Sequence, residues 1–214
     1  VLGKQVSSYG TKGIFRGSGQ GFGIGFRNMS SGGMGILLDV RGEDTYTAGN
    51  FSQGAGYFYG MGILRDFGAS SDKYTCMRYG QGAAAHYAEG VFIEDGGNDK
   101  YIGFQGAVQG AAWDRSCVVF WEKQGNDIYK TDSLFFSNGA ADNNGFAIFL
   151  DQKGKDQYNI HNRSGEVKND YHDGYSLSFF LDLKGKDKYF NNGFKNNYQN
   201  SFGNSLIFFD IKKL

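Results

Sequence analysis

Short apolar runs alternate with turns rich in glycine and acids along almost the whole chain. A representative unit is Val91–Tyr101, VFIEDGGNDKY, in which three apolar residues precede an acid, a glycine turn and an Asp-x-Tyr sequence. The apolar runs are short and contain mainly β-branched, aromatic and leucine residues, which is typical of strands. Segments such as Gly54–Gly62 contain too much glycine for a stable helix. The pattern therefore predicts short strands joined by tight corners.

The unit recurs with a nearly constant period. The Asp of Asp-x-Tyr recurs in steps of 28, 27, 28, 29 and 31 residues. A glycine usually stands two residues before this Asp and an acid five residues before it. A Gln-Gly pair such as Gln53-Gly54 follows the Tyr of the first three Asp-x-Tyr units. The period predicts an array of equivalent units rather than an irregular domain.

Three short strands per unit, with a corner after each strand, account for a period of about 28 residues. We therefore predict an all-β fold, a right-handed parallel β-solenoid in which equivalent positions of successive coils lie ~4.8 Å apart. A β-propeller is the alternative, but its blades usually need about 40 residues. We expect a single domain in which residues 1–35 form a degenerate first coil and residues 36–214 form the regular coils.

Composition agrees with this fold and disfavours two classes of partner. The 214 residues include 35 Gly and no Pro, and 17% are aromatic. Glycine permits tight corners, and the absence of proline leaves every backbone N–H free to join a ladder. Lys plus Arg and Asp plus Glu are both 22, so no basic excess favours nucleic acid. No apolar run approaches the ~20 residues of a membrane span, and we expect no membrane insertion.

The repeated aspartates raise the question of a metal. Stacked in a solenoid, they would form a column that costs roughly 1–3 kcal/mol per neighbouring pair. Either backbone N–H groups within each turn satisfy the carboxylates, or a cation such as Ca²⁺ binds them. We favour the structural turn and therefore expect no cofactor. If calcium binds, its candidate ligands are Asp44, Asp72, Asp99, Asp127, Asp156 and Asp187.

Two of the turns resemble part of a known calcium-binding motif. Gly97–Tyr101 (GNDKY) and Gly125–Tyr129 (GNDIY) are similar to the second half of the repeat of RTX β-roll proteins, the hemolysin type of bacterial repeat. That motif runs Gly-Gly-x-Gly-x-Asp-x-large apolar-x, and its Asp ligates calcium. The likeness covers about five residues per coil, and the leading glycine pair and the nine-residue period are absent here. The resemblance implies a β-solenoid turn and, as a second alternative for function, an RTX-like calcium-binding module.

The apolar triplets indicate an interface. They are apolar at all three positions, whereas a strand with one face in water should alternate. We interpret their large residues as a strip that is covered on its outer side, either by the long segments 160–175 and 191–204 or by another protein or a second copy of the chain. The members of this strip are Phe92, Trp121, Phe149, Phe180 and Phe208.

We predict a non-enzymatic scaffold that mediates protein–protein contacts in a bacterial envelope or extracellular assembly. The extracytoplasmic location, in the periplasm, at the cell surface or secreted, rests on a chain that begins at Val1, on only two cysteines and on the likeness to secreted β-solenoids. The alternative is a carbohydrate-binding or carbohydrate-active β-helix lyase or hydrolase, which needs paired acids and a base in a cleft. Because the acids recur at equivalent positions, we assign no catalytic residue.

Overall fold

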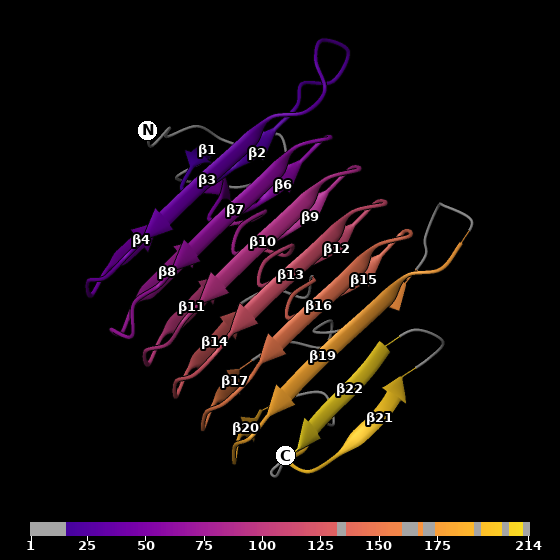
Figure 1. Cartoon of the computed structure of the whole chain (residues 1–214). Coiled ribbons are helices and arrows are strands. Elements are labelled where there is room, and N and C mark those ends of the chain that lie inside the picture. Colours follow the sequence, from indigo (N-terminus) through magenta and orange to yellow (C-terminus); the bar gives the residue numbers. More distant parts are fainter. Residues whose placement is uncertain are drawn as a thin grey trace.

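The chain forms the predicted parallel β-solenoid. The computed structural model describes residues 16–131, 136–159, 167–168, 174–190, 194–202 and 206–211. Every secondary-structure element among these residues is a β-strand. Coils of about 28 residues stack along one axis (Figure 1). No helix among the described residues is long and apolar enough to cross a membrane.

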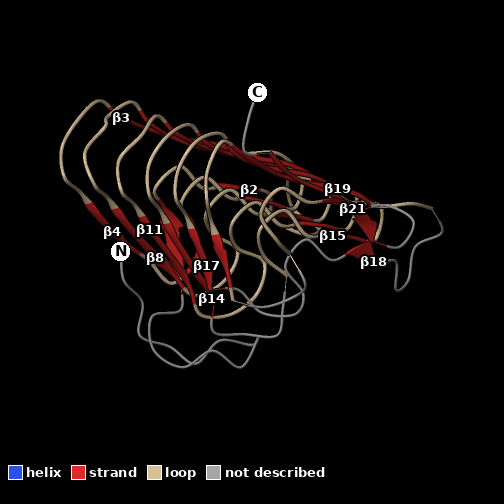
Figure 2. Cartoon of the chain, turned by 90° about the horizontal axis from the view of Figure 1, so that it is seen from below, coloured by secondary structure: helices blue, strands red, loops and turns tan. Residues whose placement is uncertain are grey.

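Three parallel sheets form the walls of the solenoid, and each regular coil contributes one strand to each wall. The first wall contains β2 (Gly23–Ile24), β6 (Gly56–Tyr57), β9 (Ala84–Ala85), β12 (Ala112–Trp113), β15 (Ala141–Asp142) and β18 (Val167–Lys168). The broad second wall contains β3 (Met34–Asp39), β7 (Met61–Asp66), β10 (Glu89–Glu94), β13 (Cys117–Glu122), β16 (Phe146–Asp151), β19 (Leu177–Leu183) and β22 (Leu206–Ile211). The third wall contains β4 (Thr45–Thr47), β8 (Lys73–Cys76), β11 (Lys100–Gly103), β14 (Ile128–Thr131), β17 (Gln157–Asn159) and β20 (Lys188–Tyr189). Figure 2 shows the coils one behind another, with corners between the walls.

Two pairings depart from this plan. β1 (Arg16–Gly19) pairs with β5 (Asn50–Ser52) in a small separate sheet. β21 (Gln199–Phe202) lies antiparallel to β22 and forms the last strand of the broad wall. In the predicted first coil, residues 1–15 lie outside the described part of the chain, whereas β2 pairs with β6 like any other coil.

Identical side chains stack inside the solenoid because successive coils are in register. Tyr101, for example, is paired with Tyr74 in the preceding coil and with Tyr129 in the next. Neighbouring rings of this tyrosine column have centroids 4.8–5.3 Å apart and planes within 9° of parallel. A phenylalanine column beside it stacks similarly, with 4.9 Å between Phe92 and Phe120. The two columns fill the core with aromatic area, which stabilises the fold by burial and ring contact.

The predicted outer strip is wrong for most of its residues. Only Trp121 faces outward. The other four are completely buried in the interior, namely Phe92, Phe149, Phe180 and Phe208. Successive residues of a strand point to opposite faces, so the middle residue of each triplet faces the core and its two neighbours face out. Trp121 follows the buried Phe120 by one residue and therefore lies on the opposite face.

We expect Phe149→Ala to lower the free energy of unfolding by about 3–5 kcal/mol, because it removes a buried ring and leaves a cavity. The Phe149 ring is fully buried between Phe120 and Phe180, with centroid distances of 4.9 and 4.8 Å. The control is Leu38→Ala on the outer face of β3, where the side chain is 60% exposed and the loss should stay below about 1 kcal/mol. Urea unfolding followed by circular dichroism measures both, and equal losses would contradict an interior Phe149.

Candidate functional site

Two columns of acids lie at the corner between the broad wall and the third wall. The wall acids occur near the end of each broad-wall strand: Asp39, Asp66, Glu94, Glu122, Asp151, Asp182 and Asp210. The corner aspartates are those of Asp-x-Tyr: Asp44, Asp72, Asp99, Asp127, Asp156 and Asp187. Apart from Asp39 and Asp44 in the first regular coil, all these acids are buried.

In five of the six coils a glycine two residues before the corner aspartate makes room for its carboxylate, whereas Ser70 stands before Asp72. A Cβ atom at Gly154 would lie 2.3 Å from both carboxylate oxygens of Asp156. At Gly125 it would lie 2.5 and 2.6 Å from those of Asp127. Any larger residue would collide with the acid, so the Gly-x-Asp spacing in the sequence reflects an inward-turned carboxylate.

Five corner aspartates each bind the backbone of the preceding coil through one carboxylate oxygen: Asp72, Asp99, Asp127, Asp156 and Asp187. Asp99 Oδ1 accepts the N–H of Asp72 at 2.6 Å, and Asp127 Oδ1 accepts the N–H of Asp99 at 2.7 Å. The predicted structural role is therefore present, but the bond joins residues 27 or 28 positions apart rather than closing one turn. The second oxygen, Oδ2, has no hydrogen-bond partner in five corner aspartates: Asp72, Asp99, Asp127, Asp156 and Asp187.

The wall acids accept hydrogen bonds from the tyrosine column. The Tyr74 hydroxyl donates to Glu94 Oε2 at 2.6 Å. The hydroxyls of Tyr129 and Tyr158 both donate to Asp151 Oδ2 at 2.8 Å. The wall acids are not among the candidate calcium ligands predicted from the sequence, which are the aspartates of Asp-x-Tyr alone. The five-residue offset between the two acids, six residues for Asp66 and Asp72, was the available signal.

Burial favours the protonated form of these carboxyls. It raises the pKa of Glu94 to about 10 and that of Asp99 to about 7. Burial, followed by the neighbouring Asp151 carboxylate, also raises the pKa values of Asp127 and Asp156. No Lys or Arg is among the buried residues that the structure describes. Compensation of the interior negative charge therefore has to come mainly from protons or from a cation.

The two columns come together in three groups whose ligand oxygens all lie within 4.8 Å of one another. They are Asp66–Asp72–Glu94, Asp127–Asp151–Asp156 and Asp156–Asp182–Asp187. Four members of the predicted calcium set thus enter such groups, always with a wall acid that the prediction omitted. Among the described residues, Asp44 and Asp99 belong to none of the groups.

The outer face of the broad wall is a second candidate site. Its two central rows of outward residues are apolar except for Arg65. One row is Ile36, Ile63, Val91, Val119, Ile148, Phe179 and Ile207, and the other is Leu38, Arg65, Ile93, Trp121, Leu150, Leu181 and Phe209. We call these rows the apolar face. The triplets were thus correctly interpreted as apolar on both sides, although the outward residues are mostly not the ones predicted.

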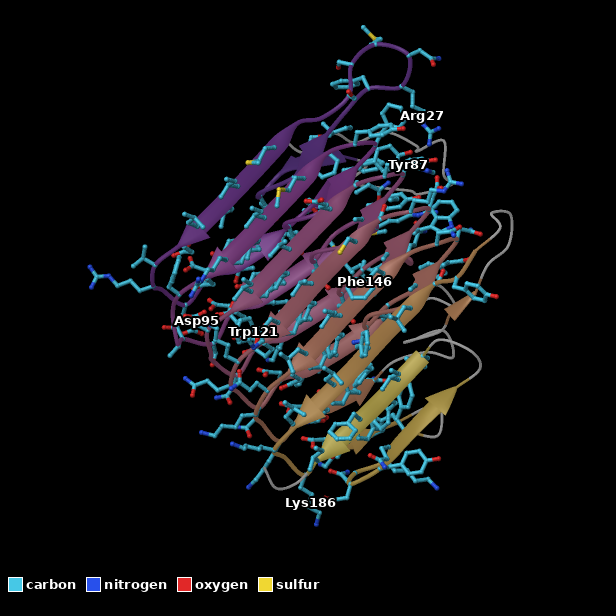
Figure 3. The ribbon with its side chains drawn as sticks, turned by 45° about the vertical axis from the view of Figure 1, so that its right-hand side comes forward. Arg27, Tyr87, Asp95, Trp121, Phe146 and Lys186 are labelled. Carbon is cyan, nitrogen blue, oxygen red and sulfur yellow. The ribbon has the colours of Figure 1, made fainter. Side chains whose placement is uncertain are left out.

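A polar network borders the apolar face beside Trp121. Arg65 Nη2 lies 3.2 Å from the Asp95 carboxylate, and Lys123 Nζ lies 2.5 Å from it. Trp121 Nε1 donates to Gln152 Oε1 at 3.2 Å. Figure 3 labels Trp121 and Asp95, which lie near each other on this side of the molecule. The arrangement is an apolar patch with a polar border, as in many protein interfaces.

No protein-family model, curated protein or solved structure matches the chain. The RTX resemblance is therefore limited to the few residues per coil that carry it. The bacterial origin and the extracytoplasmic location stay predictions.

In protein dialysed against EDTA, we expect stability to fall as the pH rises above about 4.5. The folded-state pKa of Glu94 is raised from 4.5 to about 10. Between these values the unfolded chain ionises while the folded chain keeps the proton, so the contribution to stability is complete below the lower value and is lost as the pH rises to the higher one. The slope is up to about 1.4 kcal/mol per pH unit for such a group. Glu94→Gln, which mimics the neutral acid, should match the wild type near pH 4.5 and reduce this slope, so that near pH 7 it is more stable than the wild type by up to about 3 kcal/mol.

The matched control is Glu89→Gln on the same strand, where the side chain faces outward and is exposed. Urea unfolding at pH 5, 7 and 9 compares the three proteins. A wild-type stability that does not change with pH, or a Glu94→Gln slope equal to that of the wild type, would contradict the raised pKa.

Proposed function

We propose that this chain is a non-enzymatic scaffold that self-associates through the apolar face of its broad wall. The observation that carries the proposal is the pair of outward rows on seven in-register strands, in which Arg65 is the only charged side chain. The strand at the edge of the wall leaves Ile36 and Leu38 54% and 60% exposed. Contiguous apolar area of this kind is typical of interaction sites.

The size of the apolar face suits association between two copies. Seven parallel strands ~4.8 Å apart span roughly 29 Å, and six residues along each strand span roughly 20 Å. Two such faces in contact would remove roughly 1,200 Å² from water, which is at the lower end of stable specific interfaces. Two stacked sheets pack about 10 Å apart through interdigitating side chains, and the alternating rows provide such side chains.

Charge favours a second copy as the occupant. The formal net charge of the chain is zero, so two copies do not repel each other. The border contains both signs, because Asp95 lies between Arg65 and Lys123. Under a two-fold axis the same border can meet itself with opposite charges facing. Trp121 stands beside this border and is the residue type most often central to binding energy.

The non-enzymatic part of the proposal rests on where the acids lie. A carbohydrate-active β-helix would hold acids and a base around a surface groove. A groove of about 890 Å³ runs along the corner, and its lining residues are Gly, Asn, Gln, Ala and Lys without an acid. The carboxylates of the corner point inward instead. This arrangement supports a structural role for the acids more than a catalytic one.

We expect Val119→Lys, at the centre of the apolar face, to weaken self-association at least ~100-fold, because it places a charge in the desolvated middle of the interface. The control is Ile128→Lys on β14 of the third wall, which changes an outward apolar residue in the same coil and should leave association unchanged. Sedimentation velocity between about 1 and 100 μM, a range that brackets micromolar affinities, compares the wild type with both variants, and circular dichroism verifies that each folds. A wild type that stays monomeric over this range would refute self-association.

A further inference from the structure

We propose that Ca²⁺ binds inside the solenoid, between the wall acids and the corner aspartates, at Asp127–Asp151–Asp156 and again at Asp156–Asp182–Asp187. In both groups the ligand oxygens lie within 4.8 Å of one another. Oxygens this close together can bind one cation, and Ca²⁺ takes carboxylate oxygens at about 2.3–2.6 Å in a flexible geometry.

Unpartnered oxygens point to a ligand rather than to acidity alone. Asp127 and Asp156 are 0% and 1% exposed, and the Oδ2 atom of each has no hydrogen-bond partner. Asp187 Oδ2, in the second group, is also unpartnered. A buried acceptor without a donor costs about 1–3 kcal/mol, and more when it is charged. The same cost recurs in successive coils, and one bound cation per group would offset it.

The remaining oxygens of the first group are already held in place. Asp127 Oδ1 accepts the Asp99 N–H, and Asp156 Oδ1 accepts the Asp127 N–H, both at 2.7 Å. Asp151 Oδ2 accepts two tyrosine hydroxyls. These bonds fix the carboxylates before a cation arrives, so little conformational entropy is lost on binding. Three carboxylates also exceed the charge of one Ca²⁺, and the hydrogen bonds stabilise the excess.

Only the glycine corner separates this site from solvent. Gly125 and Gly154 line the outer groove, and the Cβ positions of both lie within 2.6 Å of carboxylate oxygens inside. At these two positions glycine backbone without a side chain stands between the groove and the acids. In this proposal a cation reaches the acids through a local opening of the glycine corner.

Calcium titration of the EDTA-treated wild type tests the proposal directly. Thermal melting with up to about 10 mM CaCl₂, which exceeds the weakest affinities of calcium modules, should raise the melting temperature by about 5–10 °C. Terbium should luminesce when the tyrosines are excited, because Tyr129 and Tyr158 contact the same carboxylate, and CaCl₂ should compete that signal away. An unchanged melting temperature together with no calcium-competed terbium signal would overturn the proposal.

Asp156→Asn locates the site, because Asp156 belongs to both groups and asparagine keeps the Oδ1 acceptor for the Asp127 N–H. We expect at least a ~10-fold loss of calcium affinity by isothermal titration calorimetry and a matching loss of the terbium signal. Glu89→Gln, at an exposed acid of the broad wall, should bind calcium like the wild type. Equal affinities for Asp156→Asn and the wild type would place calcium elsewhere and overturn the proposal, and this result does not depend on self-association.

Discussion

The in-register stacking of equivalent residues is the constraint on which the rest of the structure depends. In the regular coils each side chain lies roughly 5 Å from the equivalent side chain in the coil above and in the coil below. A residue type that attracts its own kind is therefore stabilised by two neighbours, and a type that repels its own kind is destabilised by two. Tyrosine and phenylalanine gain from this rule, because their rings stack at 4.8–5.3 Å. Carboxylates are penalised by it, and the tyrosine hydroxyls and backbone N–H groups offset only part of that penalty.

Both candidate sites follow from the same rule. A row of isoleucine and valine on the outside becomes a flat apolar surface, and a row of acids on the inside becomes a column of negative charge. The apolar surface cannot form hydrogen bonds with water, and the buried carboxylates of the column repel one another without enough hydrogen-bond donors. We therefore interpret the partner of the outer face and the cation of the inner column as two consequences of the same in-register stacking.

The sequence predicted the coil well because the coil length is written in the spacing of Asp-x-Tyr. It predicted the face of each triplet poorly, because residues on both sides of the strand are apolar and the alternation that normally separates core from surface is hidden. Phe149 and Leu150 look alike in the sequence, yet Phe149 is fully buried and Leu150 faces outward.

The partners of the acids could not be read from the sequence either. Glu94 meets Tyr74, twenty positions earlier, only once the coil has closed. Its inward direction also runs against the usual exposure of acids. What the sequence did contain was the nearly constant offset between the wall acid and the corner aspartate, and this offset marks the two columns without showing that they converge.

The antiparallel strand β21 limits how the broad wall can be extended by further strands. By pairing with β22, it uses the backbone groups through which a further parallel coil would extend the broad wall at that end. A second molecule that continues the parallel ladder from β22 must first displace β21. Parallel end-to-end extension of the broad wall is thus blocked at β22, and the outer face of the sheet is left as the more accessible route to assembly.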